Sequence, residues 1–532
     1  MHSIAHFNID KHSPSSGCRI LVMIIAATLL ILLIHGLFWF GYCDRKIALG
    51  LTVFILGLGA VTAFFGFKDN DSRLNESRAF IVLLVGLGIA FGLVFPPFSV
   101  PDEDFHFSAS YVLSNFIMGK GYQSNDPVLM REDDARMFED MDTSLKDAEY
   151  VKMTDGFTSL FSVSTNEVEV ATGRSHSITG NPPQAKIVSA VAITLARLLN
   201  LGSVYLFYLG RFANLTLYVF LIWRAYKITP IGKNAVMTLS LLPMSLHLAA
   251  SYSYDAFIIP MSFLLTAECL RAIKSKGGIA KGELVQITVT AALLAPCKVI
   301  YALLAFLALV IPNERFGGRK RAWRIKLICC VLVAAFLIVT KLGDVVSTVG
   351  GTPQDSSGFD YRGAESGHFY SVSDFLSSPM KFAIMLFRTL DTYGFFYLNT
   401  LIGGSLGWFQ GDIAAPGFIV VAYVVLVIYS ALASNDDCGE LRQSVKATGA
   451  AILILGSFAV FASLLFSWTF NTEQVIQGVQ GRYFIPYLML LLVSLRPKHL
   501  YFDGNAGGIV LACIYSLNAM YLVRIFAIAL TL

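Results

Sequence analysis

Residues 79–107 read AFIVLLVGLGIAFGLVFPPFSVPDEDFHF, an apolar run that ends at two prolines and is followed by three acidic residues and a histidine. A helix crosses the hydrocarbon core of a bilayer with about 20 apolar residues, within a range of roughly 17 to 25. The pattern therefore predicts a membrane-spanning helix over 79–95, with a polar segment that emerges at the membrane surface.

The composition extends this interpretation to the whole chain. Of the 532 residues, 55% are apolar or aromatic and 14% are charged, whereas a soluble domain carries about 25% charged residues. An ordinary soluble enzyme is therefore excluded. Runs such as 20–40 and 418–433 are apolar on every face, unlike the alternating strands of a membrane barrel. The predicted fold class is an all-α polytopic membrane protein.

The apolar runs predict about thirteen membrane-spanning helices. The run 284–311 is interrupted by Pro296, Cys297 and Lys298 and has basic flanks on both sides, so we expect two short helices that turn near Lys298 and pack within protein. The runs 185–199 and 382–408 carry charges and are expected to lie in the membrane interface. The expected spans are 20–40, 47–67, 79–95, 205–226, 235–250, 257–270, the two helices of 284–311, 325–346, 415–433, 450–468, 483–495 and 509–530.

The charges are distributed unevenly along the chain. Residues 96–184 contain 15 acidic and six basic residues, a net charge of −9, whereas the whole chain carries +4 and the remainder therefore +13. Because Lys and Arg accumulate in cytoplasmic loops, we expect the acidic loop after the third span to lie outside and the N-terminus inside. The predicted divisions are N-terminal transmembrane helices (1–95), an extracytoplasmic loop with interfacial helices (96–204), a transmembrane bundle (205–346), a second extracytoplasmic loop with an interfacial helix (347–413) and C-terminal transmembrane helices (414–532).

The acidic segment contains the first candidate site residues. If a helix begins there, Asp102 and His106 share one face at i and i+4, with Glu103 and His106 at i and i+3. Such a group offers a general base and, with a divalent cation such as Mg or Mn, a set of metal ligands. The alternative is structural, because Ser99 and Asp102 fit a capping box and acidic residues favour any helix N-terminus.

A second motif, QGVQGRYFIP over 477–486, places Arg482 at the outer start of an apolar run. Arginine binds phosphate oxygens through two parallel hydrogen bonds, and the glycines Gly478 and Gly481 would let a lipid headgroup approach the backbone. The alternative is an arginine that snorkels to the membrane surface beside the interfacial Tyr483.

Three further charged residues are expected at the same membrane depth, namely Lys298, Arg211 and Asp255. Each of the two basic residues contacts a substrate, offsets a carboxylate such as Asp255, or snorkels to the membrane surface. Asp255 itself is either a site residue or a solvated turn residue. The sequence contains no phosphate-binding P-loop, no paired Cys-x-x-Cys and no His-Glu-x-x-His motif, and no nucleic-acid partner is expected.

Several stretches, taken in order, resemble the bacterial membrane family labelled domain of unknown function 2142, over about residues 79 to 495. They are PPFSVPDEDFHF with the following SASYVLSN, then NPPQAKIVSAVAITLARLL, YLGRFANLTLYV, LLPMSLHLAASYSYDAF, LGWF and VQGRYFIPYLMLLL. That family is grouped with the GT-C glycosyltransferases, whose relatives include the aminoarabinose transferase, the protein mannosyltransferases and the oligosaccharyltransferase.

The resemblance implies a GT-C-like fold, a catalytic carboxylate in the first large outer loop and a donor sugar carried on polyprenyl phosphate. Carried onto this sequence, the carboxylate falls on Asp102 with Glu103 beside it, and the phosphate-facing arginine falls on Arg482. Asp102 would deprotonate the acceptor, and Glu103 and His106 would orient this base or hold the cation. The residues expected to contact substrate are His106, Arg211, Asp255, Lys298, Arg482 and Tyr483.

The expected function is thus an inverting glycosyltransferase of the bacterial plasma membrane that places a monosaccharide on a cell-envelope glycan or glycolipid at the outer face. One alternative is a transporter or flippase for a lipid-linked glycan, which would require charges deep within several spans, whereas here they gather at the outer ends. A glycan polymerase or ligase is another alternative, which shares the outer-face chemistry and uses a diphosphate-linked oligosaccharide.

Overall fold

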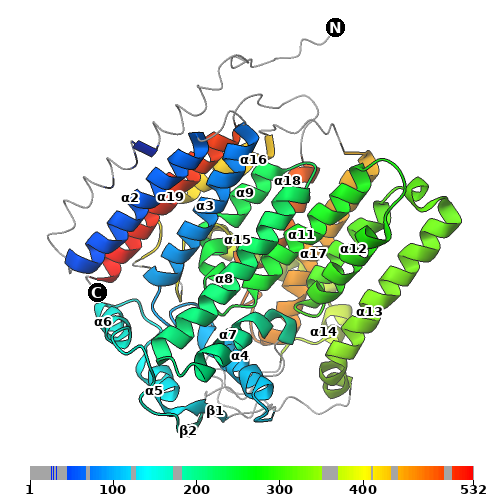
Figure 1. Ribbon diagram of the computed structural model, residues 1–532. Coiled ribbons are helices and arrows are strands. Elements are labelled where there is room, and N and C mark those ends of the chain that lie inside the picture. Colours follow the sequence, from blue (N-terminus) through cyan, green and yellow to red (C-terminus); the bar gives the residue numbers. More distant parts are fainter. Residues whose placement is uncertain are drawn as a thin grey trace.

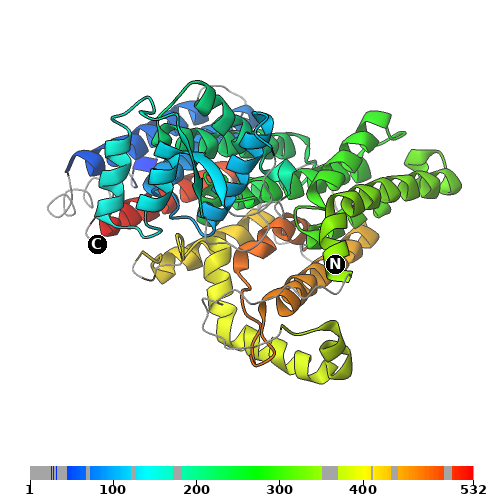
Figure 2. The ribbon, with the colours of Figure 1, turned by 90° about the horizontal axis from the view of Figure 1, so that it is seen from below.

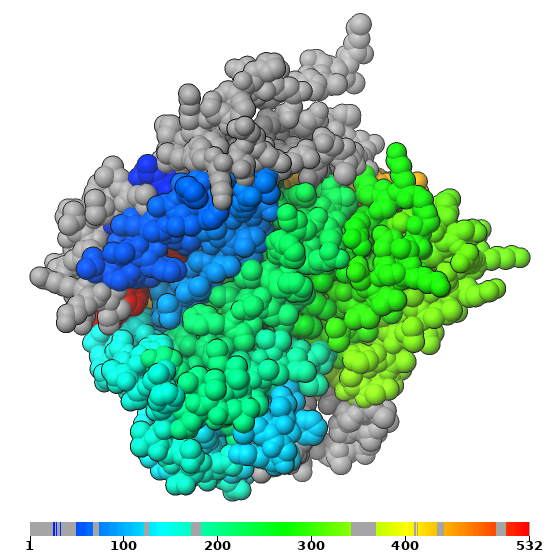
Figure 3. All heavy atoms as spheres, in the orientation of Figure 1, coloured from blue at the N-terminus to red at the C-terminus, as the bar shows by residue number. Residues whose placement is uncertain are grey.

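The computed structural model describes residues 45–67, 72–121, 127–171, 182–349, 369–408, 411, 413–432, 441–495 and 506–530, with four further residues between 25 and 32. The described part is a bundle of helices that carries a small lobe at one end (Figure 1). In the space-filling view the lobe, coloured from light blue to cyan, forms a continuous surface beneath the bundle (Figure 3).

Seven helices in this described part are long and apolar enough to cross a membrane. The protein is therefore a multi-pass helical membrane protein, as its composition predicts, but the expectation of about thirteen spans is wrong. The first expected span, 20–40, lies almost entirely outside the described residues. The seven helices are α2 (Arg45–Phe67), α3 (Ser72–Val94), α8 (Ser203–Ile228), α11 (Asp255–Lys274), α13 (Arg319–Val349), α17 (Gln443–Trp468) and α19 (Ala506–Ala529).

The number of spans differs because several apolar runs form helices too short to cross a bilayer alone. These are α9 (Lys233–Ser240), α10 (Pro243–Ala249), α12 (Lys281–Leu294), the 3-10 helix η3 (Val299–Val310), α16 (Gly417–Leu432) and α18 (Ile485–Ser494). Helix α9 stops before α10 because Pro243 lacks an amide hydrogen and disfavours helical backbone at Leu242, whose ψ is 142°. The pair α12 and η3 turns near Lys298, as the sequence predicts.

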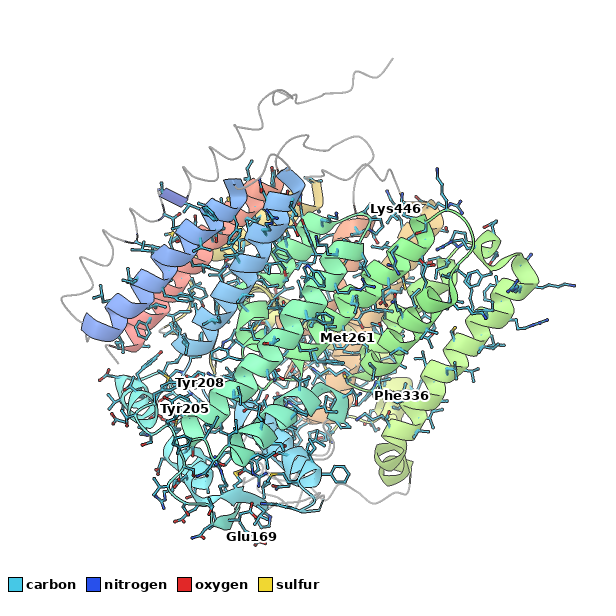
Figure 4. All side chains as sticks on the ribbon, viewed as in Figure 1. Glu169, Tyr205, Tyr208, Met261, Phe336 and Lys446 are labelled. Carbon is cyan, nitrogen blue, oxygen red and sulfur yellow. The ribbon has the colours of Figure 1, made fainter. Side chains whose placement is uncertain are left out.

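The short helices pack against protein at the centre of the bundle. All residues of α10 are buried, and α11 is 94% buried over its apolar window. Helix α11 contacts α8, α10, α12, α18 and η3, and its Met261 is labelled near the middle of the bundle in Figure 4. Short helices at membrane depth are tolerated where surrounding protein covers their ends, which explains their place in this core.

The lobe is made by the acidic loop. Its elements are α4 (Glu103–Ile117), β1 (Val128–Arg131), α5 (Glu132–Asp140), α6 (Asp147–Gly156) and β2 (Glu167–Val170). The two strands pair antiparallel, with Val128 opposite Val170. Within the lobe the buried Asp134 accepts hydrogen bonds from the Tyr111 hydroxyl at 2.8 Å and from Arg131 Nε at 2.7 Å. This network fixes α4 to β1 and α5.

Two further groups of elements pack beside the lobe and the bundle. A 3-10 turn and a helix, η2 (Pro183–Ala185) and α7 (Ile187–Leu198), connect the lobe to the bundle, and α7 packs on both α4 and α8. From below, the C-terminal elements coloured yellow and orange lie to one side of the blue-to-green elements (Figure 2). They include α14 (Val372–Ser377), α15 (Pro379–Ile402) and η5 (Gly481–Phe484).

The acidic and basic segments of the sequence lie at opposite ends of the structure. Glu169, in the lobe, and Lys446, at the start of α17, lie at opposite ends of the molecule (Figure 4). The lobe therefore marks the acidic end of the bundle.

Candidate functional site

Glu103 is wholly buried and forms an ion pair with Arg211 of α8. Arg211 Nη2 lies 2.5 Å from Glu103 Oε2, and Nε lies 2.9 Å from Oε1. The same two oxygens accept hydrogen bonds from the backbone N–H of Phe98 at 3.1 Å and of Tyr252 at 3.2 Å. The carboxylate of Glu103 is therefore fully engaged, and it holds the turn between α3 and α4 against α8.

Arg211 uses its other N–H groups to close the end of α3. It donates to the carbonyl oxygens of Gly92 at 2.9 Å, Phe95 at 2.5 Å and Pro96 at 2.9 Å. The last carbonyls of a helix have no partner within the helix, so this arginine supplies a donor to the buried Gly92 carbonyl and also ties the two residues that follow α3 to α8. Of the three roles that the sequence leaves open for Arg211, the structure supports the offset of a carboxylate, and that carboxylate is Glu103.

The turn between α3 and α4 contains two residues in the left-handed region of backbone space. Phe98 has φ 66° and Asp102 has φ 59°; aspartate adopts this conformation more readily than most residues, whereas a bulky side chain such as that of Phe98 seldom does. The Phe98 ring packs against Phe107, Phe138 and Phe207, with centroid distances of 5.5, 5.3 and 4.8 Å. Such backbone strain persists only where the surroundings enforce it, and it clusters at functional sites.

The Asp102 side chain does not cap α4. Asp102 occupies the N-cap position, but its side chain makes no capping hydrogen bond. The carboxylate is 41% exposed, and its Oδ2 lies 3.9 Å from Arg482 Nη2. The structural alternative predicted from the capping pattern is therefore wrong for this side chain, and the acidic motif and the arginine motif meet in space.

Arg482 is positioned by η5, which packs on α15. The Gly481 N–H donates to Thr400 Oγ1 at 2.7 Å, and a Cβ atom at Gly481 would collide with the backbone of α15. Gly478, with φ +77°, lies against the Trp468 indole. The expectation that these glycines admit a lipid headgroup is corrected, because the space beside them is occupied by protein.

The guanidinium of Arg482 lies between two carboxylates. It is 3.9 Å from Asp102 and, through Nη1, 3.9 Å from Oδ2 of the buried Asp255, and its side chain is only 5% exposed. Both separations are too long for hydrogen bonds. Within the described residues, Arg482 Nε and the buried Gln480 Oε1 have no hydrogen-bond partner. Arg482 can therefore offer a planar fork of donors to an acceptor with two oxygens.

A lysine and two tyrosines form the other side of this site. Lys298 Nζ lies 3.8 Å from the centroid of the Tyr483 ring and 4.9 Å from that of Tyr254, distances at which a cation interacts with an aromatic face. The Arg482 guanidinium lies 5.4 Å from the Tyr483 centroid. The structure thus brings together Asp102, Asp255, Lys298, Arg482 and Tyr483 from separate parts of the chain.

Lys186, between η2 and α7, is a member of this site that the sequence analysis missed. It is buried, donates to the Tyr252 carbonyl oxygen at 2.6 Å, and lies 5.8 Å from the Tyr254 ring centroid. Burial lowers the pKa of the Lys186 amine well below its usual range, against the opposing pull of Asp255 and Glu103. The available signal was a lysine at the start of an apolar helix, which marks a functional candidate in a membrane protein.

His106 lies beside the site, with its ring 4.7 Å from that of Tyr254. The predicted metal set of Asp102, Glu103 and His106 is not supported. No group of three His, Cys, Asp or Glu side chains that could hold a metal ion occurs among the described residues, and Arg211 occupies both oxygens of Glu103. The residues do not fit a bound divalent cation.

The site combines an accessible carboxylate with a group of cations. Asp102 is partly exposed, whereas the two cations of the site are less accessible: Arg482 is buried and Lys298 is half-buried. An anion would be attracted to the cations, and a hydroxyl group beside it could lose its proton to Asp102. This arrangement suits the binding of a phosphate next to a general base.

Comparison with known protein families finds a match to one family. The family described as predicted membrane protein (DUF2142) matches residues 83–491, which include every site residue named above. No curated protein and no solved structure matches the chain.

Proposed function

This chain belongs to the DUF2142 family of predicted membrane proteins, and from that premise we propose that it is an inverting glycosyltransferase of the GT-C type. It moves a monosaccharide from a polyprenyl-phosphate donor to a cell-envelope glycan or glycolipid. The reaction takes place at the lobe end of the bundle, on the outer face of the bacterial plasma membrane, with the N-terminus in the cytoplasm. The acidic lobe supports this orientation, because basic segments remain on the cytoplasmic side.

The observation that carries the proposal is the position of Arg482. Its guanidinium stands 3.9 Å from each of two carboxylates, and its Nε has no hydrogen-bond partner in the described part of the chain. A buried arginine held in this way binds a phosphate through two parallel hydrogen bonds. Lys298 adds a second positive charge beside Tyr483.

Asp102 is the proposed general base. Its carboxylate takes the proton of the acceptor hydroxyl as that oxygen attacks the anomeric carbon of the donor sugar. The new bond joins the acceptor oxygen to the anomeric carbon, and the bond from that carbon to the phosphate oxygen breaks. The electron pair leaves with polyprenyl phosphate, whose increased negative charge Arg482 and Lys298 stabilise. Attack opposite the leaving group inverts the configuration of the sugar.

Glu103 has a positioning role in this proposal. Because Arg211 and two backbone N–H groups occupy its oxygens, it fixes the turn that carries Asp102 without taking a proton itself. Asp255 helps to orient the Arg482 guanidinium, because it faces Nη1 whereas Asp102 faces Nη2.

The test is donor cleavage by purified protein in lipid nanodiscs with a panel of polyprenyl-phosphate sugars. Wild type should release polyprenyl phosphate from at least one donor, Asp102→Asn should not, and Glu139→Gln, which removes an exposed acidic residue of the lobe, should behave as wild type. If no donor is cleaved while vesicles containing the protein move donor between leaflets, the flippase alternative replaces the transferase.

A further inference from the structure

A cavity lies away from the candidate site, between α12, η3 and α13. Its empty space is about 870 Å³, a volume that includes space open to the surroundings. Its wall is apolar over most of its area and includes Ala291, Ala305, Ala334 and Leu337. Helix α13 lies at the edge of the bundle (Figures 1 and 2), and only 11% of its apolar window is buried. The cavity therefore opens where α13 faces the membrane.

The cavity has the depth of one membrane leaflet. Its lining on α13 extends from Ile325 to Leu337, a separation of 12 positions along the helix, which corresponds to about 18 Å at a rise of about 1.5 Å per residue. The hydrocarbon core of a bilayer is about 30 Å thick, so one leaflet contributes about 15 Å. An acyl chain that enters from one surface would match this length.

The end of the cavity near the start of α13 is strongly basic. Residues 314–326 contain six basic residues and one acidic residue, Glu314. Lys326 lines the cavity and donates to the carbonyl oxygens of Leu309 and Ile311, both at 2.7 Å, which joins the end of η3 to α13. The exposed basic residues beside it are Arg319, Lys320, Arg321 and Arg324. An apolar cavity with a basic entrance is complementary to a lipid that has an anionic headgroup.

We propose that this cavity binds an anionic phospholipid of the leaflet at the basic end of the bundle. The acyl chain lies between α12, η3 and α13, and the phosphate meets the exposed basic residues at the start of α13. This site is separate from the proposed transfer reaction and does not depend on it. It gives the protein a preference for anionic lipid on the face opposite the lobe.

The test uses phosphatidylglycerol with a photoreactive acyl chain, present as a trace in phosphatidylcholine nanodiscs that contain the full-length protein. Crosslinks are mapped by mass spectrometry. We expect wild-type crosslinks within α12 and α13, and we expect unlabelled phosphatidylglycerol to compete with the probe far better than added phosphatidylcholine. Ala334→Trp, which places a large side chain in the cavity, should remove most of this labelling. The matched control is Ala335→Trp, because Ala335 is also exposed on the same helix but does not line the cavity.

The headgroup contact is tested by replacing Arg319, Lys320, Arg321 and Arg324 together with glutamine. Competition by phosphatidylglycerol should then weaken by about tenfold or more, whereas Lys227→Gln with Lys276→Gln, at other exposed positions, should leave it unchanged. Equal labelling of the two tryptophan variants would overturn the cavity assignment. Equal competition by phosphatidylcholine, or competition by polyprenyl phosphate and not by phosphatidylglycerol, would overturn the choice of lipid.

Discussion

Replacement of Glu103 by glutamine tests whether this carboxylate is structural, in contrast to the reactive carboxylate proposed at Asp102. Glu103 and Asp102 are adjacent in sequence, yet one is wholly buried against Arg211 and the other is 41% exposed. Glu103→Gln leaves the Arg211 guanidinium buried with no opposing charge, whereas Asp102→Asn removes a partly solvated carboxylate that lies 3.9 Å from its cation. Asp102→Asn is therefore the matched control, with the same change of carboxylate to amide.

The two substitutions should differ greatly in their effect on stability. Removing one partner of a buried ion pair costs about 3 to 5 kcal/mol, whereas a partly exposed pair contributes about 0 to 1 kcal/mol. With an unfolding entropy of about 2.1 cal/mol/K per residue, the 532-residue chain would change its free energy of unfolding by about 1.1 kcal/mol per degree. We therefore expect Glu103→Gln to lower the unfolding midpoint by about 3 to 5 °C, and Asp102→Asn by less than about 1 °C.

The assay is thermal unfolding in mixed micelles at one fixed scan rate, because large membrane proteins often unfold irreversibly and their midpoints then depend on the rate of heating. Midpoints for the two variants that agree within about 1 °C would refute the conclusion that Glu103 holds the turn between α3 and α4.

Three further predictions concern other residues. Arg482→Lys keeps the charge but loses the two-point contact with phosphate, so turnover at saturating donor should fall much more than stability does; unchanged turnover would remove this residue from the site. The Lys186 pKa is lowered in the folded state. Below the usual lysine pKa of about 10.4, the unfolded state therefore binds more protons than the folded state, and the free energy of unfolding of wild type increases as the pH rises. The unfolding midpoint of wild type should therefore rise relative to that of Lys186→Met between about pH 7 and about pH 9, and a constant difference would contradict a neutral buried amine. In a background without native cysteines, Val163→Cys, at a position 91% exposed in the lobe, should react with an impermeant thiol reagent in intact cells, whereas Lys320→Cys should not; the reverse pattern would invert the orientation.

The helical class and the principal breaks follow from the sequence, whereas the number of spans does not. Apolar composition reports burial in either lipid or protein, so runs such as 235–250 and 284–311 could not be distinguished from full spans by hydropathy. Pro296 and Lys298 did mark the turn between α12 and η3, because proline breaks a helix and a charge avoids its apolar face. Pro243 could likewise have predicted the break before α10, but only the structure shows that the helix ends there.

The sequence predicted most residues of the candidate site but not the contacts between them. Motif chemistry selected Asp102 and Arg482, which the structure places together. Spacing along one helix could not show that Glu103 faces Arg211, because that pair is formed between elements 108 residues apart. Lys186 was missed for a similar reason, since its contact with the Tyr252 carbonyl depends on the packing of α7 against the bundle.

The central claim is tested most directly by separating donor binding from donor cleavage in Asp102→Asn. Purified wild type and variant are compared in nanodiscs for the affinity of a polyprenyl-phosphate sugar and for its single-turnover cleavage with acceptor present. We expect the variant to bind the donor about as tightly as wild type, because Arg482 and Lys298 remain, and to lose cleavage by a factor of about 10² to 10⁴. A variant that cleaves donor at the wild-type rate would contradict the assignment of Asp102 as the base.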